Sequence, residues 1–416
     1  MRKGRSRRYL MLISGVALAA GSATTASAAT PASIAGIGEL RGVYCTSASN
    51  CLAVGDVFVK AADLNQLLHW NGKTWSKVAV PSPGGTHTDD FSELHAVRCT
   101  TPDNCWAVGE YLHGAQLNQI LRWNGKKWRV AAGIPEPGGE INGEFSELED
   151  VACTSAKNCW AVGQFGKDSA TGEVILNQAL RWNGKTWSHV PTPNPAGTAT
   201  NDENDLVGIR CATVNDCWAV GAYGNEQNGG RLFNEVLHWT GKKWTKVTVP
   251  NPGGTAIRDF STLVSVSCTS TADCKAVGSY GSNAIGGARL NEVLSWNGTK
   301  WSVPKIPNPD GTAAGDAQNL TGISCLSPHS CWTACHSGTQ TQPTGTLNEA
   351  FRWNGKKWSQ VTTPDPGGMT MHGVSQFFAI RCVTSADCWA VGNQVNGGGA
   401  FHDMILHWNG TKWIVK

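Results

Sequence analysis

Charged side chains are scarce in this sequence, since Asp, Glu, Lys and Arg together make up only 16% of its 416 residues. The two signs nearly balance, and the formal net charge is +3. Loss of residues 1–28, which carry five basic and no acidic side chains, would change the net charge to −2. A chain without a broad basic field is poorly suited to nucleic acids or anionic membranes. We therefore expect no nucleic-acid partner.

Several motifs of catalysis and membrane insertion are missing. The sequence has no Gly-x-Ser-x-Gly elbow of the hydrolases and no glycine-rich loop that would bind phosphates. No segment after the N-terminus is long and apolar enough to cross a bilayer, which needs about 20 apolar residues. The histidines are scattered, and the one directly adjacent His/Asp pair is His402-Asp403. A nucleotide-binding enzyme, a transmembrane segment and a His-rich zinc site therefore have no support.

The N-terminus has the pattern of an export signal. A basic stretch from Arg2 to Arg8 precedes the apolar run Leu10–Ala20, and Ala26-Ser27-Ala28 offers a cleavage site of small residues. Arg7-Arg8 also resembles a twin-arginine signal, so the general and the twin-arginine export routes both stay open. We predict a signal peptide at 1–28, a short linker at 29–37 and a single domain at 38–416. The protein is expected to be secreted, either extracellular or associated with the cell envelope.

What the chain does contain is one unit repeated seven times, which we number repeat 1 to repeat 7. Two cysteines six positions apart mark each repeat, and the repeats start 54, 54, 58, 57, 57 and 57 residues apart. Self-similarity at a fixed period is typical of solenoids, propellers and other arrays. The pairs are Cys45/Cys51, Cys99/Cys105, Cys153/Cys159, Cys211/Cys217, Cys268/Cys274, Cys325/Cys331 and Cys382/Cys388.

Each repeat predicts four short strands. A Leu-x-x-Val-x-Cys strand and a second strand from the second Cys flank a polar turn, and two further strands flank an Asn-Gly turn such as Asn71-Gly72. Asn-Gly is a strong hairpin signal. A two-residue turn there would pair Leu68 with Trp75 and place Trp70 and Trp75 on one sheet face. Fourteen of the nineteen Trp occupy these two hairpin positions, and the other five follow the second Cys.

Seven four-stranded units with a period near 57 predict an all-β fold, a seven-bladed β-propeller with four antiparallel strands per blade. Cys105-Trp106-Ala107-Val108-Gly109, Leu117-Asn118, Trp123 and Trp128 resemble the kelch-type propeller repeat. The pattern is also similar to Cys- and Trp-bearing repeats of secreted actinobacterial proteins. A sandwich array and a solenoid are the alternatives. Stacking of the Trp-bearing face on the next blade would build a continuous core.

The paired cysteines predict one disulfide within each blade. Facing positions on adjacent strands bring Cβ atoms within about 4.5–5.5 Å, and the expected compartment is oxidising. Each short loop would contribute about 2 kcal/mol to stability. Cys335 is left over, either free or in competition with Cys325 for Cys331. A zinc or redox site is the weaker alternative, because Cys-x5-Cys is not a usual zinc spacing.

The position before the first-strand Leu gives the candidate site. If that strand is innermost, these side chains surround one mouth of a central channel, with carboxylates on one half and neutral polar groups on the other. Such a ring could hold Ca²⁺ or grip a polyhydroxylated or cationic ligand; the alternative is that polar residues simply enter a strand at a wet surface. Around the ring they are Glu39, Glu93, Glu147, Asp205, Thr262, Asn319 and Gln376.

The leading functional interpretation is an extracellular binding module for a carbohydrate or protein ligand, acting as a monomer. Loops of unequal length on a rigid scaffold are common binding sites. The runner-up is a propeller enzyme, a glycoside hydrolase or lyase, that acts on extracellular polysaccharide through carboxylates such as Glu93, Glu147 and Asp205. A purely structural envelope protein is the third interpretation. Catalytic residues and any metal ligands stay unassigned at this stage.

Overall fold

The computed structural model describes residues 37–169, 172–225, 230–282, 287–339, 345–368, 373–395 and 399–416. The expected signal peptide and all but the last residue of the expected linker lie outside these ranges. All the regular secondary structure of the described residues is β-strand, and none of their segments forms a helix able to cross a membrane. The prediction of an all-β fold is therefore confirmed.

Each repeat contributes four strands in chain order. The first strands are β1 (Gly38–Ser47), β5 (Ser92–Thr101), β9 (Glu144–Ser155), β13 (Asp202–Thr213), β17 (Phe260–Ser270), β21 (Asp316–Ser327) and β25 (Val374–Thr384). The second strands are β2 (Asn50–Val59), β6 (Asn104–His113), β10 (Asn158–Ser169), β14 (Asp216–Asn225), β18 (Asp273–Gly281), β22 (Ser330–Thr339) and β26 (Asp387–Val395).

The third and fourth strands form the outer part of each repeat, and the fourth strand is always the shorter of the two. The third strands are β3 (Ala62–Trp70), β7 (Ala115–Trp123), β11 (Gly172–Trp182), β15 (Arg231–Trp239), β19 (Arg289–Trp296), β23 (Leu347–Trp353) and β27 (Phe401–Trp408). The fourth strands are β4 (Trp75–Lys77), β8 (Trp128–Val130), β12 (Trp187–His189), β16 (Trp244–Lys246), β20 (Trp301–Ser302), β24 (Trp358–Val361) and β28 (Trp413–Val415).

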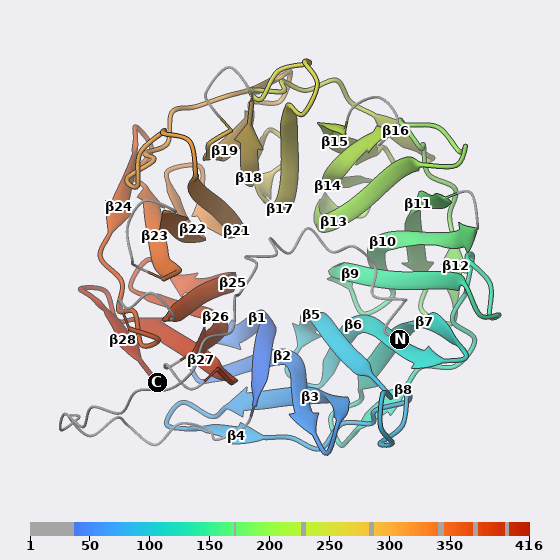
Figure 1. Ribbon diagram of the computed structural model, residues 1–416. Coiled ribbons are helices and arrows are strands. Elements are labelled where there is room, and N and C mark those ends of the chain that lie inside the picture. Colours follow the sequence, from blue (N-terminus) through green and yellow to red (C-terminus); the bar gives the residue numbers. More distant parts are fainter. Residues whose placement is uncertain are drawn as a thin grey trace.

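The repeats are arranged around a common axis in a propeller-like fold (Figure 1). Within a repeat each strand pairs antiparallel with the next, as in the order β1-β2-β3-β4. The first strands lie innermost, and each contacts the first strand of the following repeat. β25 contacts β1 in the same way, so repeat 7 lies against repeat 1.

The Asn-Gly hairpin has a longer turn than predicted. Trp70, not Leu68, pairs with Trp75, so the loop contains four residues instead of two. Asn71 explains the difference, because its Oδ1 accepts hydrogen bonds from the backbone N–H groups of Lys73 at 2.9 Å and Thr74 at 3.0 Å. This side-chain cap replaces a tight type I′ turn. The conclusion that both indoles share one sheet face still holds.

Indole rings join neighbouring repeats. Where a Trp follows the second Cys, it packs on the two hairpin Trp of the next repeat, with ring centroids 4.9 Å apart for Trp106–Trp182 and 5.2 Å apart for Trp106–Trp187. Aromatic pairs at this spacing contribute about 0.5–1.5 kcal/mol beyond the area they bury. Trp389 of repeat 7 packs in the same way on Trp70 and Trp75 of repeat 1.

The disulfide prediction is confirmed for every pair. Each bridge joins directly facing residues of the first and second strands of one repeat, and seven disulfides in one chain are typical of an oxidising, extracellular environment. The bonded pairs are Cys45–Cys51, Cys99–Cys105, Cys153–Cys159, Cys211–Cys217, Cys268–Cys274, Cys325–Cys331 and Cys382–Cys388.

The bridges are also part of the core, which the sequence did not indicate. The spacing of the cysteines around a polar turn predicted only a disulfide that links the two strands of each hairpin. In the structure, the second cysteine of every pair is also completely buried or nearly so. In five repeats it belongs to the same hydrophobic cluster as an indole of the preceding repeat, repeat 7 preceding repeat 1 around the axis. These cysteines and their indoles are Cys51 with Trp389, Cys159 with Trp106, Cys217 with Trp160, Cys274 with Trp218, and Cys388 with Trp332.

The bonding leaves one cysteine over. Cys325 is bonded to Cys331, so Cys335 is a buried free thiol and the competing pairing is excluded in this structure. Because the sulfurs of all seven pairs are bonded to one another, these pairs offer no thiolate to a zinc ion. The alternative of a zinc site built from the paired cysteines is therefore wrong.

Candidate functional site

The structure places the seven predicted ring residues at one level of the innermost strands, each opposite a second-strand residue. Glu39 faces Asp56, Glu93 faces Glu110, and Glu147 faces Gln164 in the strand register. The residue just after the repeated Gly of the second strand thus stands beside each predicted carboxylate. Repeats 1 to 3 supply acidic or amide groups at both positions, and their side chains join in one polar network.

Arg41 holds the first part of this network together. Its guanidinium contacts Glu39, lies 3.0 Å from Oδ1 of Asp56, and lies 3.4 Å from Oε2 of Glu93. Asn393 of β26 donates a hydrogen bond to Glu39 at 2.9 Å, which ties repeat 7 to the same group. One cation thus faces three carboxylates, and this part of the network has an excess of negative charge.

Burial and this crowding alter the ionisation of Asp56. Burial raises the pKa of Asp56 to about 7 from an ordinary value of 3.8. Arg41 opposes the rise, whereas the carboxylates of Glu93 and Glu39 add to it. At neutral pH Asp56 is therefore protonated in part of the molecules, and a cation bound nearby would favour its ionised form.

His95 lies at the centre of the network. Its Nδ1 is 3.1 Å from the carbonyl oxygen of Leu148 and 3.2 Å from a carboxylate oxygen of Glu149. A ring nitrogen between two acceptors must carry the proton, so in the neutral ring Nε2 presents its lone pair. Nε2 lies 4.0 Å from Oε2 of Glu93 and 3.9 Å from Oε1 of Glu110.

Glu93, His95 and Glu110 form the metal-capable group among the described residues. All three are buried, and their ligand atoms lie within 4.8 Å of one another. A histidine that ligates a metal commonly donates its other N–H to a carbonyl or carboxylate, which is the arrangement of His95 here. An imidazole nitrogen with two carboxylate oxygens suits zinc or manganese better than Ca²⁺, which prefers oxygen ligands.

Glu147 completes the network on the side of repeat 3. It is fully buried, and both of its carboxylate oxygens accept hydrogen bonds. Gln116 donates to Oε2 of Glu147 at 2.6 Å and also to Glu110, and Gln164 donates to Oε1 of Glu147. These amides fix the rotamer of Glu147 and connect it to the group around His95.

Among the described residues, none of the other four predicted residues is seen to hydrogen-bond to the network, although the charge of Glu149 acts on Asp205. Asp205 is half-buried, one of its oxygens has no hydrogen-bond partner among the described residues, and burial raises its pKa well above the ordinary value. Thr262 donates to a backbone carbonyl, and Asn319 accepts a hydrogen bond from Arg289 at 3.1 Å. Gln376 is half-buried on β25. The seven predicted positions therefore fall into two groups: those of repeats 1 to 3 share one polar network, and those of repeats 4 to 7 have separate surroundings.

Sequence reasoning missed the central residues of the site, although a signal was present. Arg41, His95 and Glu149 each follow a predicted carboxylate by two positions, the spacing that places side chains on one side of a strand. Asp56 and Glu110 directly follow the repeated Gly, which faces the first-strand Leu. The alternation of side chains along the first strand, together with its pairing to the second strand, would have indicated these positions.

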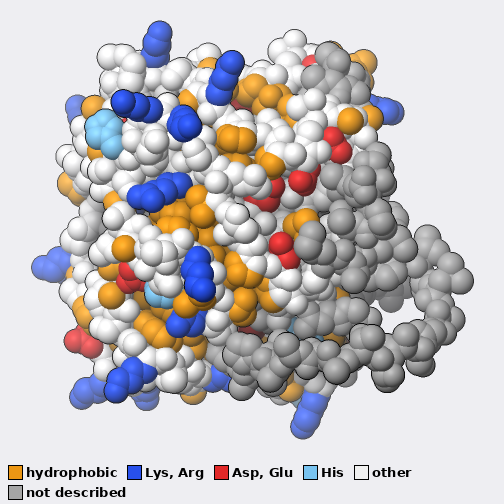
Figure 2. Space-filling model, turned by 90° about the vertical axis from the view of Figure 1, so that its left-hand side faces the viewer, with side chains coloured by type: hydrophobic (Ala, Val, Ile, Leu, Met, Phe, Trp, Pro, Cys, Tyr) orange, Lys and Arg blue, Asp and Glu red, His pale blue; other side chains and the backbone are white. Residues whose placement is uncertain are grey.

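The opposite face is basic. The turns between third and fourth strands carry exposed lysines in every repeat, and in Figure 2 the Lys and Arg side chains lie mostly away from the grey residues. Charged tips limit edge-to-edge pairing of Trp-rich hairpins. These lysines are Lys73, Lys126, Lys127, Lys185, Lys242, Lys243, Lys300, Lys356, Lys357 and Lys412.

No family model and no curated protein matches the chain. Among solved structures it is similar to a polysaccharide lyase, an ulvan lyase bound to GlcA(1-4)Rha3S, at 10% identity with a TM-score of 0.54, covering 89% of this chain and 92% of that one. Puromycin hydrolase aligns at 8% identity with a TM-score of 0.53, covering 92% of this chain and 54% of that one. A fucose-binding lectin from Aleuria aurantia, a six-bladed β-propeller, aligns at 13% identity with a TM-score of 0.44, covering 79% and 98%. At these identities the likeness concerns the fold alone.

Proposed function

We propose that this chain is a secreted seven-bladed β-propeller, with four strands in each blade, that binds carbohydrate outside the cell as a monomer. The contact between β25 and β1 supports a closed ring of seven blades. The seven disulfides support a location in an oxidising compartment. The expected signal peptide at 1–28 would export the chain to such a compartment.

The network from Glu39 to Gln164 is the observation that carries the binding proposal. Its carboxylates and amides are held by one another before any ligand arrives, so little side-chain entropy is lost on binding. Sugar hydroxyls are hydrogen-bond donors as well as acceptors, and a fixed carboxylate can accept from two neighbouring hydroxyl groups. Glu39 is a half-buried carboxylate of this network and the acceptor that a polyhydroxylated ligand reaches first, with the buried groups fixed behind it.

The charge of the mouth narrows the ligand class. One arginine faces Glu39, Asp56 and Glu93, so a polyanionic sugar would meet repulsion there. We propose neutral or amino sugars as ligands. The ulvan lyase of similar fold is bound to a sugar with uronate and sulfate groups, and we expect this chain to differ from that protein in ligand charge.

Screening of the mature protein on a glycan array, followed by titration calorimetry, tests the proposal. Glu93→Gln should weaken binding of the selected glycan at least tenfold, whereas Gln376→Ala, at the same ring position but outside the network, should change it less than twofold. Thermal unfolding of both variants checks that they fold. Absence of any neutral or amino sugar among the bound glycans, or equal binding by both variants, would remove the proposal.

One observation favours the runner-up, an enzyme acting on extracellular polysaccharide. The amide nitrogen of Gln116 contacts carboxylate oxygens of both Glu110 and Glu147, so two carboxyl groups lie close together. Glycoside hydrolysis uses such a pair, about 5–9.5 Å apart. Release of reducing or unsaturated sugar ends, abolished by Glu147→Gln, would establish catalysis. Binding of a polysaccharide without any turnover over days would exclude the enzyme and support the binding module.

A further inference from the structure

A second site, separate from the acidic mouth, lies where one indole of the repeat pattern is missing. In five repeats the residue after the second Cys is Trp, and its ring packs on two Trp of the next repeat with centroids between 4.7 and 5.6 Å. The two exceptions are Leu52 in repeat 1 and Lys275 in repeat 5.

In repeat 5 the side chain of Lys275 itself fills the space that an indole occupies in other repeats. Lys275 is buried, and its Nζ lies 2.9 Å from Asp273 and 6.0 Å from the centre of the Trp353 ring. The long methylene stem and the cation over the aromatic face take the place of the absent indole.

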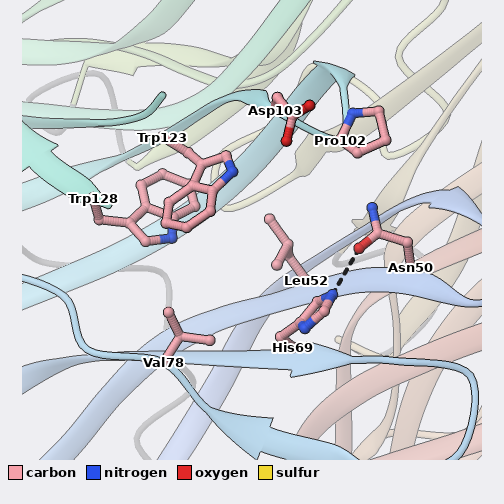
Figure 3. A pocket seen from close by; sticks show the side chains of 8 residues that line it. All are labelled: Asn50, Leu52, His69, Val78, Pro102, Asp103, Trp123 and Trp128. Atoms are coloured by element: carbon pink, nitrogen blue, oxygen red, sulfur yellow. Dashed lines mark hydrogen bonds between the residues drawn. The ribbon is translucent and has the colours of Figure 1, made fainter. Parts of the chain in front are cut away.

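Leu52 is too short to do the same, and a cavity of about 250 Å³ remains between repeats 1 and 2. Figure 3 shows the indoles of Trp123 and Trp128 on one side of this cavity and His69 on the other, with Leu52 between them. Asp103 stands at its edge and is exposed. Trp123 and Trp128 are the hairpin pair that an indole of repeat 1 would otherwise cover.

His69 is held in the orientation of two histidines that each stack on an indole. His238 stacks on Trp218 with centroids 4.0 Å apart and planes 11° apart, and the Nε2 of this His lies 2.8 Å from Asp216. His69 occupies the same strand position, and its Nε2 lies 2.7 Å from Oδ1 of Asn50, the residue equivalent to Asp216.

The second precedent gives the same geometry. His407 stacks on Trp389 with centroids 4.2 Å apart, and its Nε2 lies 2.8 Å from Asp387. The same held histidine thus occurs three times in the chain. In two repeats it stacks on the Trp that follows the second Cys, and at His69 it faces a cavity. Both precedents show that a planar ring of indole size fits between the histidine and the Trp pair.

We propose that the cavity between repeats 1 and 2 binds an indole ring from outside, stacked on His69 and packed on Trp123 and Trp128. The carboxylate of Asp103 at the edge favours a ligand with a positive charge beside the ring. The indole comes either from a small amine or from an exposed Trp of a partner polypeptide. This proposal does not depend on carbohydrate binding at the mouth.

Titration calorimetry on the mature protein tests the proposal with four probes: tryptamine, indole-3-acetate, the peptide Gly-Trp-Gly and methyl glycosides. We expect tryptamine to bind at one site and at least tenfold more tightly than indole-3-acetate, because Asp103 attracts the amine. Tighter binding by the peptide than by tryptamine assigns a polypeptide source, and the reverse order assigns a small amine.

Variants separate this site from others. Leu52→Trp should fill the cavity, abolish tryptamine binding and raise the thermal midpoint, whereas His69→Ala should weaken binding at least tenfold. Lys275→Trp, the same position in repeat 5, is the matched control and should leave binding unchanged. Trp389→Leu keeps His407 in place and should raise the stoichiometry from one to two. Failure of every indole probe at millimolar concentration, undiminished binding by Leu52→Trp, or methyl glycosides that bind this cavity in place of indoles would overturn the proposal.

Discussion

Gln66 of β3 donates a hydrogen bond from Nε2 to Oδ2 of Asp403 on β27 at 2.7 Å, although 337 positions separate the two residues. The same two positions are bonded between neighbouring repeats elsewhere, as in Asn118 and Gln178, whose amides exchange two hydrogen bonds of 2.6 and 3.1 Å. In that pair each amide both donates and accepts. The bond between Gln66 and Asp403 is the version of this pair that joins the last repeat to the first.

Asp403→Asn is predicted to stabilise the protein at pH 8. Oε1 of Gln66 is buried without a partner among the described residues, and Asn at 403 would supply the missing donor, as Asn118 does for Gln178. Burial also raises the pKa of Asp403 to about 6 from 3.8, so the stability it contributes is present below pH 3.8 and is lost as the pH rises through 6. Thermal unfolding at pH 4 and pH 8 should show a gain for the variant at pH 8 only.

Asp403→Ala is the matched comparison for that substitution. It removes the acceptor of Gln66 and leaves a buried donor unpaired, which costs about 1–3 kcal/mol. The free energy of unfolding should therefore fall at pH 4 and fall less at pH 8, where the substitution also removes a buried ionised carboxylate. A lower midpoint for Asp403→Asn at pH 8 would show that the reciprocal amide pair does not form between repeats 7 and 1.

Three buried glutamates at the position of Gln178 predict a second pH effect. Glu235, Glu292 and Glu349 lie where other repeats have Gln, and Asn177 donates to Glu235 at 2.5 Å. Burial raises the pKa of Glu235 and of Glu292 well above the ordinary value, and that of Glu349 to about 8. These residues therefore stabilise the fold as neutral acids, and that stability is lost as the pH rises above the ordinary value of 4.5 and through the raised pKa of each, which for Glu349 is about 8.

The triple Glu→Gln variant should remove this loss. At pH 5 its thermal midpoint should match that of the unsubstituted protein, and at pH 9 it should be clearly higher, since each pKa unit corresponds to about 1.4 kcal/mol. Glu140→Gln, an exposed substitution, controls for net charge. Parallel pH profiles for the triple variant and the unsubstituted protein would contradict the assignment of neutral carboxyl groups.

The parts of the fold that depend on short-range spacing could be predicted from the sequence. Cys45 and Cys51 flank one turn, and their facing register follows from the hairpin alone. The contact of Trp106 with Trp182 and Trp187 required only that successive repeats stack. The loop at Asn71 was mispredicted because a side-chain cap, not the Asn-Gly pair itself, sets its length.

The site was predictable only in part, because its contacts cross between repeats. Glu39, Glu93 and Glu147 were named among seven ring positions, but their link through Arg41 and His95 depends on a bulge that shifts the register of the first strand after Leu40 and its equivalents. The missing Trp at Leu52 is visible in the sequence. Whether the gap is filled, as Lys275 fills its own, depends on side-chain packing that spacing does not encode.

The cysteines give a chemical test of the fold. Seven disulfides and one buried thiol predict no reaction of the native protein with Ellman's reagent and one reactive thiol in guanidinium without reductant. Burial raises the pKa of the Cys335 thiol, which slows its reaction further. Cys335→Ser should abolish the signal in guanidinium. More than one reactive thiol in the denatured, unreduced protein would mean that one of the seven bridges does not form.

The arrangement around His95 predicts selective binding of a transition metal. In the neutral ring with its proton on Nδ1, between Leu148 and Glu149, the lone pair of Nε2 points toward Glu93 and Glu110. Calorimetry should show that Zn²⁺ or Mn²⁺ binds at one site, and that Ca²⁺ binds at least tenfold more weakly, because an imidazole nitrogen is a poor ligand for calcium. Binding should tighten from pH 5.5 to 7.5, since the imidazole must be neutral to ligate.

Two histidine variants complete the metal test. His95→Ala should abolish binding, and His113→Ala, which removes an exposed histidine of the same repeat, should leave it unchanged. Zn²⁺ should also raise the thermal midpoint of the unsubstituted protein but not of His95→Ala, because a ligand stabilises only the state that binds it. If Zn²⁺ and Mn²⁺ give no heat at pH 7.5, or if His95→Ala binds them equally, then Arg41 alone balances these carboxylates and the group around His95 orders the channel mouth without a metal.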